Sequence, residues 1–433
     1  MGTISPTDVT VGSPSGQELG ADAVTYLDDN SIYGPVSDWA TDFDHADPEY
    51  NKNTHAIWDQ LRGTCPVAHT QRYGGTWLPT THDLVHEIAY DTDHFSSRGV
   101  VVATVKPSDN PDAPPAPIGG APPITSDPPD HTWHRRLILP YFSPKAVERY
   151  EIFTRALCQE LMATITAEGR HHADAAVEYA QQIPPRVIAE IIGVPREDTD
   201  QFVEWTRAVL ENGALQPEAR LIARKEMLTY FFGLLESRKQ ERRDDITSFL
   251  LDQEVDGQPL RDGHIVGTIT LLLIAGIDTT WSSIGSALLH LATHPDDRRR
   301  LAAEPELMPT AVEEFLRAYS PVTMARIATA DVELGGRTIH SGDRILLTFP
   351  AANRDPEHFE RPDEVLIDRA HNRHVAFGVG IHRCAGSNLA RMEMQVAIGE
   401  WLAALPDFEV DPHGELTFAG GQVRGPRNLP VTY

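Results

Sequence analysis

The sequence is poor in cysteine, and this limits the kinds of protein it can encode. Among 433 residues the cysteines are Cys65, Cys158 and Cys384, which are far apart and form no Cys-x-x-Cys pair. This number and spacing argue against a disulfide framework and against a structural zinc site made of cysteines. A reducing compartment fits the pattern.

Positive charge and long apolar runs are also scarce. The chain has 37 Lys and Arg against 63 Asp and Glu, a formal net charge of −26, which argues against nucleic acid and anionic membranes as partners. The longest strongly apolar run, Leu271 to Ile277, stops at Asp278 and is too short to span a bilayer. The N-terminus has no basic segment followed by an apolar one, so no signal peptide is predicted. We expect a cytoplasmic monomer.

The patterns that are present are mainly helical. Residues 263–294 are predicted to form one long helix, apolar on all faces, as in a helix buried in the middle of a large protein. A further helix is predicted over 388–405. The segments 332–339 and 343–351 alternate like strands with glycine turns. The expected class is mainly α with small β-sheets (α+β).

The domain organisation follows from composition. Residues 1–22 are polar and are predicted to be a disordered N-terminal tail. Residues 23–433 are predicted to form a single domain. Within it, the proline-rich stretch 100–129 is long for a connection and is typical of a lid or a binding loop.

Cys384 lies between a glycine-rich loop and the start of the predicted C-terminal helix. The backbone N–H groups and the dipole of a helix N-terminus favour an anion such as a thiolate. Gly378, Gly380 and Gly386 leave room for a flat or bulky group to approach the backbone. Taken alone, the pattern is better explained by a buried structural cysteine beside a tight turn.

The full stretch from Phe377 to Arg391, FGVGIHRCAGSNLAR, resembles the haem-binding signature of the cytochrome P450 family. The resemblance implies the cytochrome P450 fold, with a long central helix over the haem, and Cys384 as the thiolate ligand and the metal-binding residue. It implies that Phe377 packs near the haem and that His382 reaches a propionate. Gly378 and Gly386 belong to the same cofactor-binding loop. The implied cofactor is haem b, iron protoporphyrin IX, with dioxygen as co-substrate.

The middle of the long helix reads Ala275-Gly276-Ile277-Asp278-Thr279-Thr280. A local explanation is that Thr279 bonds back to the carbonyl of Ala275 while Asp278 finds a nearby partner. The stretch is similar to the oxygen-binding groove of the family. That similarity implies that Ala275 borders the haem, that Thr279 hydrogen-bonds dioxygen and that Asp278 helps to deliver protons.

Three basic residues match positions that pair with haem propionates in the family. His131 and Arg135 lie four residues apart on one predicted helix face, and Arg326 follows nine residues after Arg317. Each one alone reads as a solvated charge. Together they imply a site for two carboxylates, which are costly to bury without partners.

Glu314-Phe315-Leu316-Arg317 resembles the family's Glu-x-x-Arg structural pair. The usual third partner is missing from its place in the segment RPDEVLIDR, where Glu364 and Val365 stand. His374 is predicted to take this role.

The resemblance implies a bacterial-type haem-thiolate monooxygenase that hydroxylates a lipophilic small molecule. Electrons would come from a separate ferredoxin and its NAD(P)H-dependent reductase. Arg136 and Arg383 are either the docking site of the ferredoxin or only paired with nearby carboxylates. Apolar segments at 100–129, 205–217, 274–275 and 322–324 are expected near the substrate pocket. Two alternatives are a peroxygenase that uses hydrogen peroxide and a haem-binding sensor without turnover. The acid and threonine in the long helix favour the monooxygenase.

Overall fold

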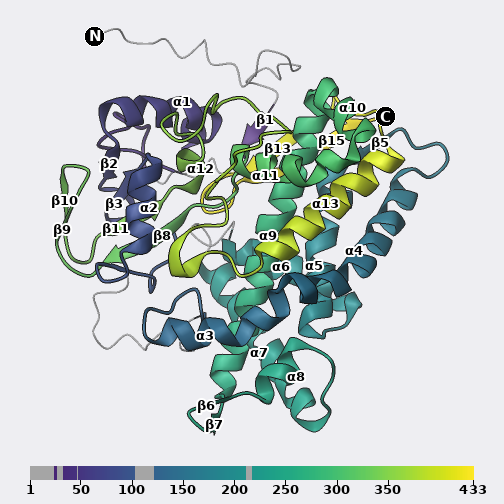
Figure 1. The fold of residues 1–433 in the computed structure, drawn as a ribbon, viewed down its shortest axis with the longest axis horizontal. Coiled ribbons are helices and arrows are strands. Elements are labelled where there is room, and N and C mark those ends of the chain that lie inside the picture. The colour runs from purple at the N-terminus through teal and green to yellow at the C-terminus, as the bar shows by residue number, and fades with distance from the viewer. Residues whose placement is uncertain (1–23, 27–32, 46, 103–120, 211–216) are drawn as a thin grey trace.

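The computed structural model describes residues 24–26, 33–45, 47–102, 121–210 and 217–433 (Figure 1). The predicted tail 1–22 and most of the proline-rich stretch lie outside these ranges. The helices are α1 Pro48–Thr64, α2 His82–Tyr90, α3 Asp130–Ile138, α4 Pro144–Ile165, α5 Ile183–Ile192, α6 Thr199–Leu210, α7 Pro217–Gln240, α8 Ile246–Leu251, α9 Asp262–Thr293, α10 Pro295–Ala303, α11 Met308–Ala318, α12 Phe349–Ala352 and α13 Ser387–Ala404.

Short strands connect and flank the helices. They are β1 Val24–Tyr26, β2 Val67–Thr70, β3 Thr76–Pro79, β4 Phe95–Ser96, β5 His172–Asp174, β6 Glu254–Val255, β7 Gln258–Pro259, β8 Met324–Ala328, β9 Val332–Leu334, β10 Arg337–Ile339, β11 Arg344–Leu347, β12 Glu409–Val410, β13 Leu416–Ala419, β14 Gly425–Asn428 and β15 Pro430–Thr432. The predicted class, mainly α with small β-sheets, is confirmed.

The central helix α9 matches the prediction from its apolar pattern. It ends at Thr293, and the next helix begins at once with Pro295, a residue that fits the first turn of a helix but not its interior. Within the described residues α9 is the one helix long and apolar enough to cross a membrane. However, 67% of its most apolar window is buried inside the protein, so α9 is a core helix.

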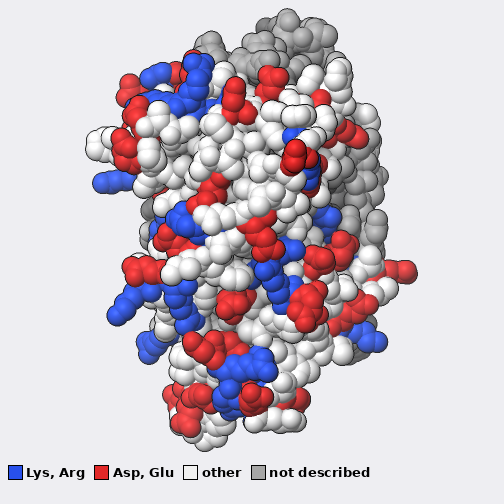
Figure 2. All heavy atoms as spheres, turned by 90° about the vertical axis from the view of Figure 1, so that its right-hand side faces the viewer, with Lys and Arg blue, Asp and Glu red and all other residues white. Residues whose placement is uncertain are grey.

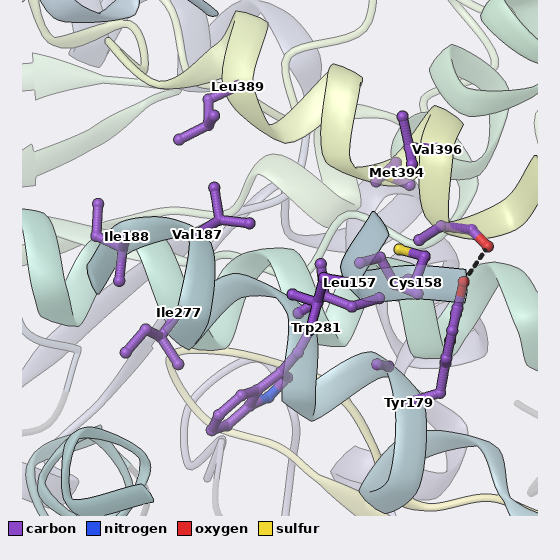
Figure 3. Close-up of a cluster of buried hydrophobic side chains, with 14 of the residues drawn as sticks. Leu157, Cys158, Tyr179, Val187, Ile188, Ile277, Trp281, Leu389, Met394 and Val396 are labelled. Atoms are coloured by element: carbon purple, nitrogen blue, oxygen red, sulfur yellow. Dashed lines mark hydrogen bonds between the residues drawn. The ribbon is translucent and has the colours of Figure 1, made fainter. Parts of the chain in front are cut away.

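The main core lies where α9, α5, α4 and α13 meet. In Figure 1 the yellow α13 runs alongside α4, and the two helices are packed together. Figure 3 shows side chains from all four helices converging on one apolar cluster. The hydroxyl of Tyr179 donates to the carbonyl of Ala397 in α13 at 2.8 Å, which satisfies a polar group inside this cluster. The labelled core residues on these helices are Leu157, Cys158, Val187, Ile188, Ile277, Trp281, Leu389, Met394 and Val396.

A five-stranded sheet lies beside the helical part, in the order β2-β3-β11-β8-β4. Its β3–β11 pair is parallel and the other pairs are antiparallel. The prediction of a strand over 343–351 is right only as far as Leu347, because Phe349–Ala352 forms α12. Pro350 cannot donate to a strand ladder but is tolerated in the first turn of a helix. The hairpin β9–β10 matches the predicted alternation at 332–339.

Charge on the described surface is mixed despite the negative total. Figure 2 shows Lys and Arg side chains interspersed with Asp and Glu over one face of the molecule. Surface ion pairs such as Arg155 with Glu151, 2.8 Å apart, occur among these charges. Such exposed pairs add little to stability.

Candidate active site

The cysteine loop, residues 377–386, is closed by its own backbone. The N–H of Cys384 donates to the carbonyl of Phe377 at 2.7 Å. Gly378 and Gly380 have φ values of 68° and 72°, the left-handed region that favours glycine. A Cβ at Gly380 would lie 2.6 Å from the carbonyl oxygen of Ala89, at the end of α2. Backbone conformation therefore explains glycine at position 378, and backbone conformation together with close packing explains it at position 380.

Gly386 differs from the other two glycines. Its φ is −82°, and a Cβ there would meet Cys384 and Phe142 only at ordinary contact distances. Neither backbone conformation nor a steric clash therefore requires glycine at position 386. The half-buried ring of Phe377 borders the loop, with the guanidinium carbon of Arg391 4.5 Å from its centroid.

The thiol of Cys384 combines two properties that rarely occur together. Its side chain is exposed, yet burial among protein atoms raises its pKa. These properties agree if the thiol lies deep in the protein but borders an open space. The backbone N–H of Gly386 and the charges of Arg135, Arg383 and Arg391 act in the opposite direction and favour the thiolate.

His131, His382 and Arg326 form a basic cluster, although they come from α3, the cysteine loop and β8. His131 and Arg326 are buried, and His382 is half-buried. The two imidazole rings lie 4.3 Å apart, and His382 Nε2 is 2.8 Å from Ser97 Oγ. Burial, followed by the charges of Arg326 and His131, lowers the pKa of His382 to about 3. This cluster of donors therefore suits an anion.

The cluster also contains polar atoms that the described protein leaves unused. His131 is 4% exposed, and its buried Nε2 has no hydrogen-bond partner among the described residues. Arg326 is 5% exposed and pairs with no carboxylate of the described chain; its Nη1 donates to the carbonyl of Ala325. Burial lowers the pKa of Arg326 to about 10. Both residues are poised to bind a negative group.

Arg135 has a different environment from the other predicted propionate ligands. Its Nη2 donates to the carbonyl of Arg383, and its charge acts on Cys384. Arg135 therefore connects α3 with the cysteine loop. Burial lowers its pKa.

The middle of α9 is accessible although the helix is a core element. Ala275 is exposed, and Leu271, Ile274 and Thr279 are partly exposed, at the spacing of one helix face. The hydroxyl of Thr279 donates back to the carbonyl of Ala275 at 2.9 Å, as the local explanation predicts. This accessible stripe is apolar except for the hydroxyl, so it suits an apolar ligand.

Asp278 is directed into the core. It is 1% exposed, and its Oδ1 accepts from Arg427 Nη2 at 3.0 Å and from the hydroxyl of Ser282 at 3.1 Å. Ser282 is the local partner that the sequence predicted for Asp278. The charged partner, Arg427, lies 149 residues away in β14.

The Glu314–Arg317 pair is fully buried and bidentate, with both N···O distances 2.9 Å. The predicted third partner, His374, is wrong. Arg369 Nε donates to Glu314 Oε2 at 2.9 Å, and His374 binds the neighbouring Glu313 instead. Arg369 is the last residue of the segment RPDEVLIDR, so a search for the next arginine would have found it.

Sequence reasoning also missed Ser97, which bonds His382, and Arg427, which bonds Asp278. Neither residue lies in a recognisable local pattern. Both reach the site only because distant segments pack together.

The comparisons with known proteins agree with this geometry. The family profile described as Cytochrome P450 matches residues 219–417. Mycinamicin IV hydroxylase/epoxidase of Micromonospora griseorubida is 33% identical, over 87% of this chain and 94% of its own. Vitamin D(3) 25-hydroxylase of Pseudonocardia autotrophica is 36% identical, over 88% of this chain and 94% of its own. The structure of cytochrome P450 PksS of the Bacillus subtilis bacillaene polyketide synthase has a TM-score of 0.80 at 31% identity, covering 90% of this chain and 99% of its own.

The described residues fit the haem b that this family carries. The thiol of Cys384 is exposed, so it is accessible to the iron of the cofactor. His131 Nε2 has no hydrogen-bond partner among the described residues, and Arg326 forms no ion pair with a described carboxylate. Both side chains are therefore suited to bind the two propionates of haem. The chain therefore belongs to the cytochrome P450 family, as a bacterial haem-dependent monooxygenase that uses redox partners and oxidises lipophilic small molecules.

Proposed function

We propose that this enzyme hydroxylates a lipophilic molecule of steroid or macrolide size in the cytoplasm, with electrons from a ferredoxin and its NAD(P)H-dependent reductase. The observation that carries the proposal is the accessible apolar stripe on a core helix, with the hydroxyl of Thr279 among its members. The names of two relatives support hydroxylation of an organic small molecule, because one is a mycinamicin IV hydroxylase/epoxidase and the other a vitamin D(3) 25-hydroxylase.

Cys384 is assigned as the thiolate that holds the cofactor. When bound, haem b supplies activation of dioxygen, and a thiolate ligand donates electron density that favours O–O cleavage. The chain's contribution is to stabilise the thiolate through the N–H of Gly386 and the surrounding arginines. His131, Arg326 and His382 are assigned to the propionates.

Thr279 and Asp278 are assigned to proton delivery. The Thr279 hydroxyl lies on the accessible face of α9, where it can hydrogen-bond a reacting oxygen in place of the Ala275 carbonyl. Asp278 is the neighbouring acid, held by Arg427. Insertion of one oxygen atom and reduction of the other to water requires two protons and two electrons, and this pair would supply the protons.

The pocket is assigned to apolar side chains on two elements. Leu271, Ile274 and Ala275 of α9 are accessible, and Val322 and Met324 are half-buried at the start of β8. Such surfaces bind a ligand mainly through burial of apolar area, at about 25 cal/mol per Å². A panel of steroids, macrolides and fatty acids, read by the Soret shift when water leaves the iron, tests the class. A preference for fatty acids over the two larger classes would contradict it.

The thiolate assignment is tested by Cys384→Ser. The variant should lose the red-shifted carbon monoxide spectrum that thiolate haem gives. Cys65→Ser is the matched control, because Cys65 is buried and its thiol donates to the carbonyl of Val67, away from the loop. A normal spectrum from Cys384→Ser, or its loss in both variants, would remove the assignment.

The ferredoxin is assigned to the surface around the cysteine loop. Arg136 and Arg383 are both exposed there, whereas Arg391 is bound to Glu313. An acidic partner would be attracted locally and repelled by the rest of the chain, so reduction should slow as salt rises. Arg136→Glu and Arg383→Glu should slow stopped-flow reduction. Arg299→Glu is the control, because Arg299 is exposed in α10. Rates indifferent to salt and to both test substitutions would contradict this docking.

A further inference from the structure

A cluster of metal-binding side chains lies outside the candidate active site. It consists of His82 and Asp83, the first two residues of α2, and His358, which follows α12. Each offers one ligand atom, and the three atoms lie within 4.8 Å of one another. His358 Nε2 is 2.8 Å from Asp83 Oδ1, and His82 Nδ1 is 3.7 Å from the same oxygen.

His82 is held in place while its Nδ1 makes no hydrogen bond to a described residue and only a long 3.7 Å approach to Asp83. The Nδ1 atom is buried and has no hydrogen-bond partner among the described residues. The backbone N–H of His82 donates to Asp355 Oδ2 at 2.8 Å, which fixes the start of α2 against the segment after α12. The His82 and His358 rings are stacked, with centroids 3.8 Å apart. A buried imidazole nitrogen without a partner is costly unless something binds it.

We propose that His82, Asp83 and His358 bind a divalent transition-metal ion, with Zn²⁺ the best match. Two imidazole nitrogens and one carboxylate oxygen are a donor set that zinc accepts, with water in the fourth position. Tetrahedral ligands about 2.0–2.1 Å from zinc are about 3.4 Å apart, within the range of the observed separations. To bind the ion, His358 must turn out of its stack with His82 and exchange its 2.8 Å contact with Asp83 for the metal. Its side chain is about a third exposed, which leaves room on the solvent side for this movement.

The ion would act as a structural clip. It would join the start of α2 to the segment that follows α12, two pieces of chain about 275 residues apart. The other end of α2 carries the Ala89 carbonyl that contacts Gly380 of the cysteine loop. A metal at the first end therefore restrains a helix whose second end supports the loop. The clip is independent of haem and of turnover.

The first experiment measures zinc binding by calorimetry. The protein should be the untagged holoenzyme, freed of adventitious metal with a chelator, because a histidine tag would bind zinc itself. We expect one saturable zinc site and no comparable heat with Mg²⁺, which prefers oxygen ligands. His82→Ala, His358→Ala and Asp83→Asn should each weaken binding by about tenfold or more.

His94→Ala is the matched control. His94 pairs with Asp91 at 2.7 Å, much as His358 pairs with Asp83. Among the described residues, however, no second histidine joins the His94–Asp91 pair to complete a metal-binding group. Its zinc affinity should equal that of the parent. Equal loss in His94→Ala and His82→Ala would overturn the proposal.

Two further measurements locate the ion and test the clip. Anomalous scattering at the zinc edge should place zinc between the three side chains, and zinc found only elsewhere would overturn the proposal. Zinc should raise the melting temperature of the parent but not of the His82→Ala/His358→Ala double variant, since a ligand that binds only the folded state stabilises it. No saturable zinc binding to the parent would also overturn it.

Discussion

Arg427 near the C-terminus donates to Asp278 in the middle of the central helix, 3.0 Å away, and both side chains are almost completely buried. Ser282, one turn further along α9, accepts from Arg427 Nη1 at 3.0 Å and donates to the same carboxylate oxygen. This three-residue network ties β14 to α9. It also means that any proton carried by Asp278 is exchanged beside a guanidinium.

Removing the guanidinium of Arg427 should strongly destabilise the folded protein, because the carboxylate of Asp278 would stay buried without its partner. Arg427→Met is expected to lower the free energy of unfolding by about 3 kcal/mol, the usual effect of breaking a buried ion pair from one side. Denaturant titration of the holoenzyme measures this. The double variant Arg427→Met/Asp278→Asn should lose less than the sum of the two single variants.

The control for this prediction is Arg155→Met. Arg155 pairs with Glu400, but the arginine side chain is 45% exposed, so the change should be below about 1 kcal/mol. Equal losses in Arg155→Met and Arg427→Met would show that the buried pair has no special weight.

Thr279→Ala should separate binding from oxygen chemistry. The substitution removes a hydroxyl whose described bond is to its own helix, so folding and substrate affinity should change little. Without the hydroxyl, product formed per NAD(P)H should fall by about tenfold, with hydrogen peroxide as the difference, because a positioned proton donor contributes at least that much. Peroxide and product assays with the purified redox partners check this.

Thr268→Ala is the matched control for that variant. Thr268 lies on the same helix with the same type of bond, to the carbonyl of His264 at 2.9 Å, but is 2% exposed. Coupling should be unchanged in it. Full coupling in Thr279→Ala would refute the role of the hydroxyl.

Arg326→Ala should weaken cofactor retention. Arg326 is buried and forms no ion pair with a carboxylate of the described residues, so it is free to bind a haem propionate. A hydrogen bond to a charged group contributes about 1.5–3 kcal/mol. Haem transfer to an excess of apomyoglobin should therefore be faster by about tenfold or more. Arg299→Ala, on the exposed surface of α10, should not change this rate. The same rate in both variants would contradict the assignment.

Glu313 gives a pH-dependent contribution to stability. Burial opposes its ionisation, but hydrogen bonds from Arg391 and His374 outweigh burial and lower its pKa from 4.5 to about 2. Because the folded-state pKa is the lower one, the stabilisation is complete above about pH 4.5 and is lost as the pH falls toward 2. Glu313→Gln should therefore reduce the free energy of unfolding near neutral pH by roughly 2–3 kcal/mol.

The difference between parent and Glu313→Gln should shrink to nothing between pH 4.5 and 2, as measured by denaturant titrations at several pH values. Glu364→Gln is the comparison, because Glu364 pairs with Arg361 on the surface, where solvent screens the interaction. A Glu313→Gln effect that persists unchanged at acid pH would contradict the assigned pKa.

The sequence alone determined the features that depend on neighbouring residues. The apolar pattern of α9 predicted a buried central helix, and the helical spacing of apolar residues over 388–405 predicted α13. Helix periodicity is set by contacts within a few residues, so a local pattern is enough to predict it. The long motif around Cys384 also identified the family, which the comparisons confirm.

Only the tertiary structure decided which distant side chains complete these features. It placed Arg369 rather than His374 against Glu314, Arg427 against Asp278, and His358 beside His82. These partners are separated by 55, 149 and about 276 residues, and no periodic signal links them. A buried charge requires a partner, but the sequence states only the requirement; the packing of the chain selects which arginine or histidine meets it.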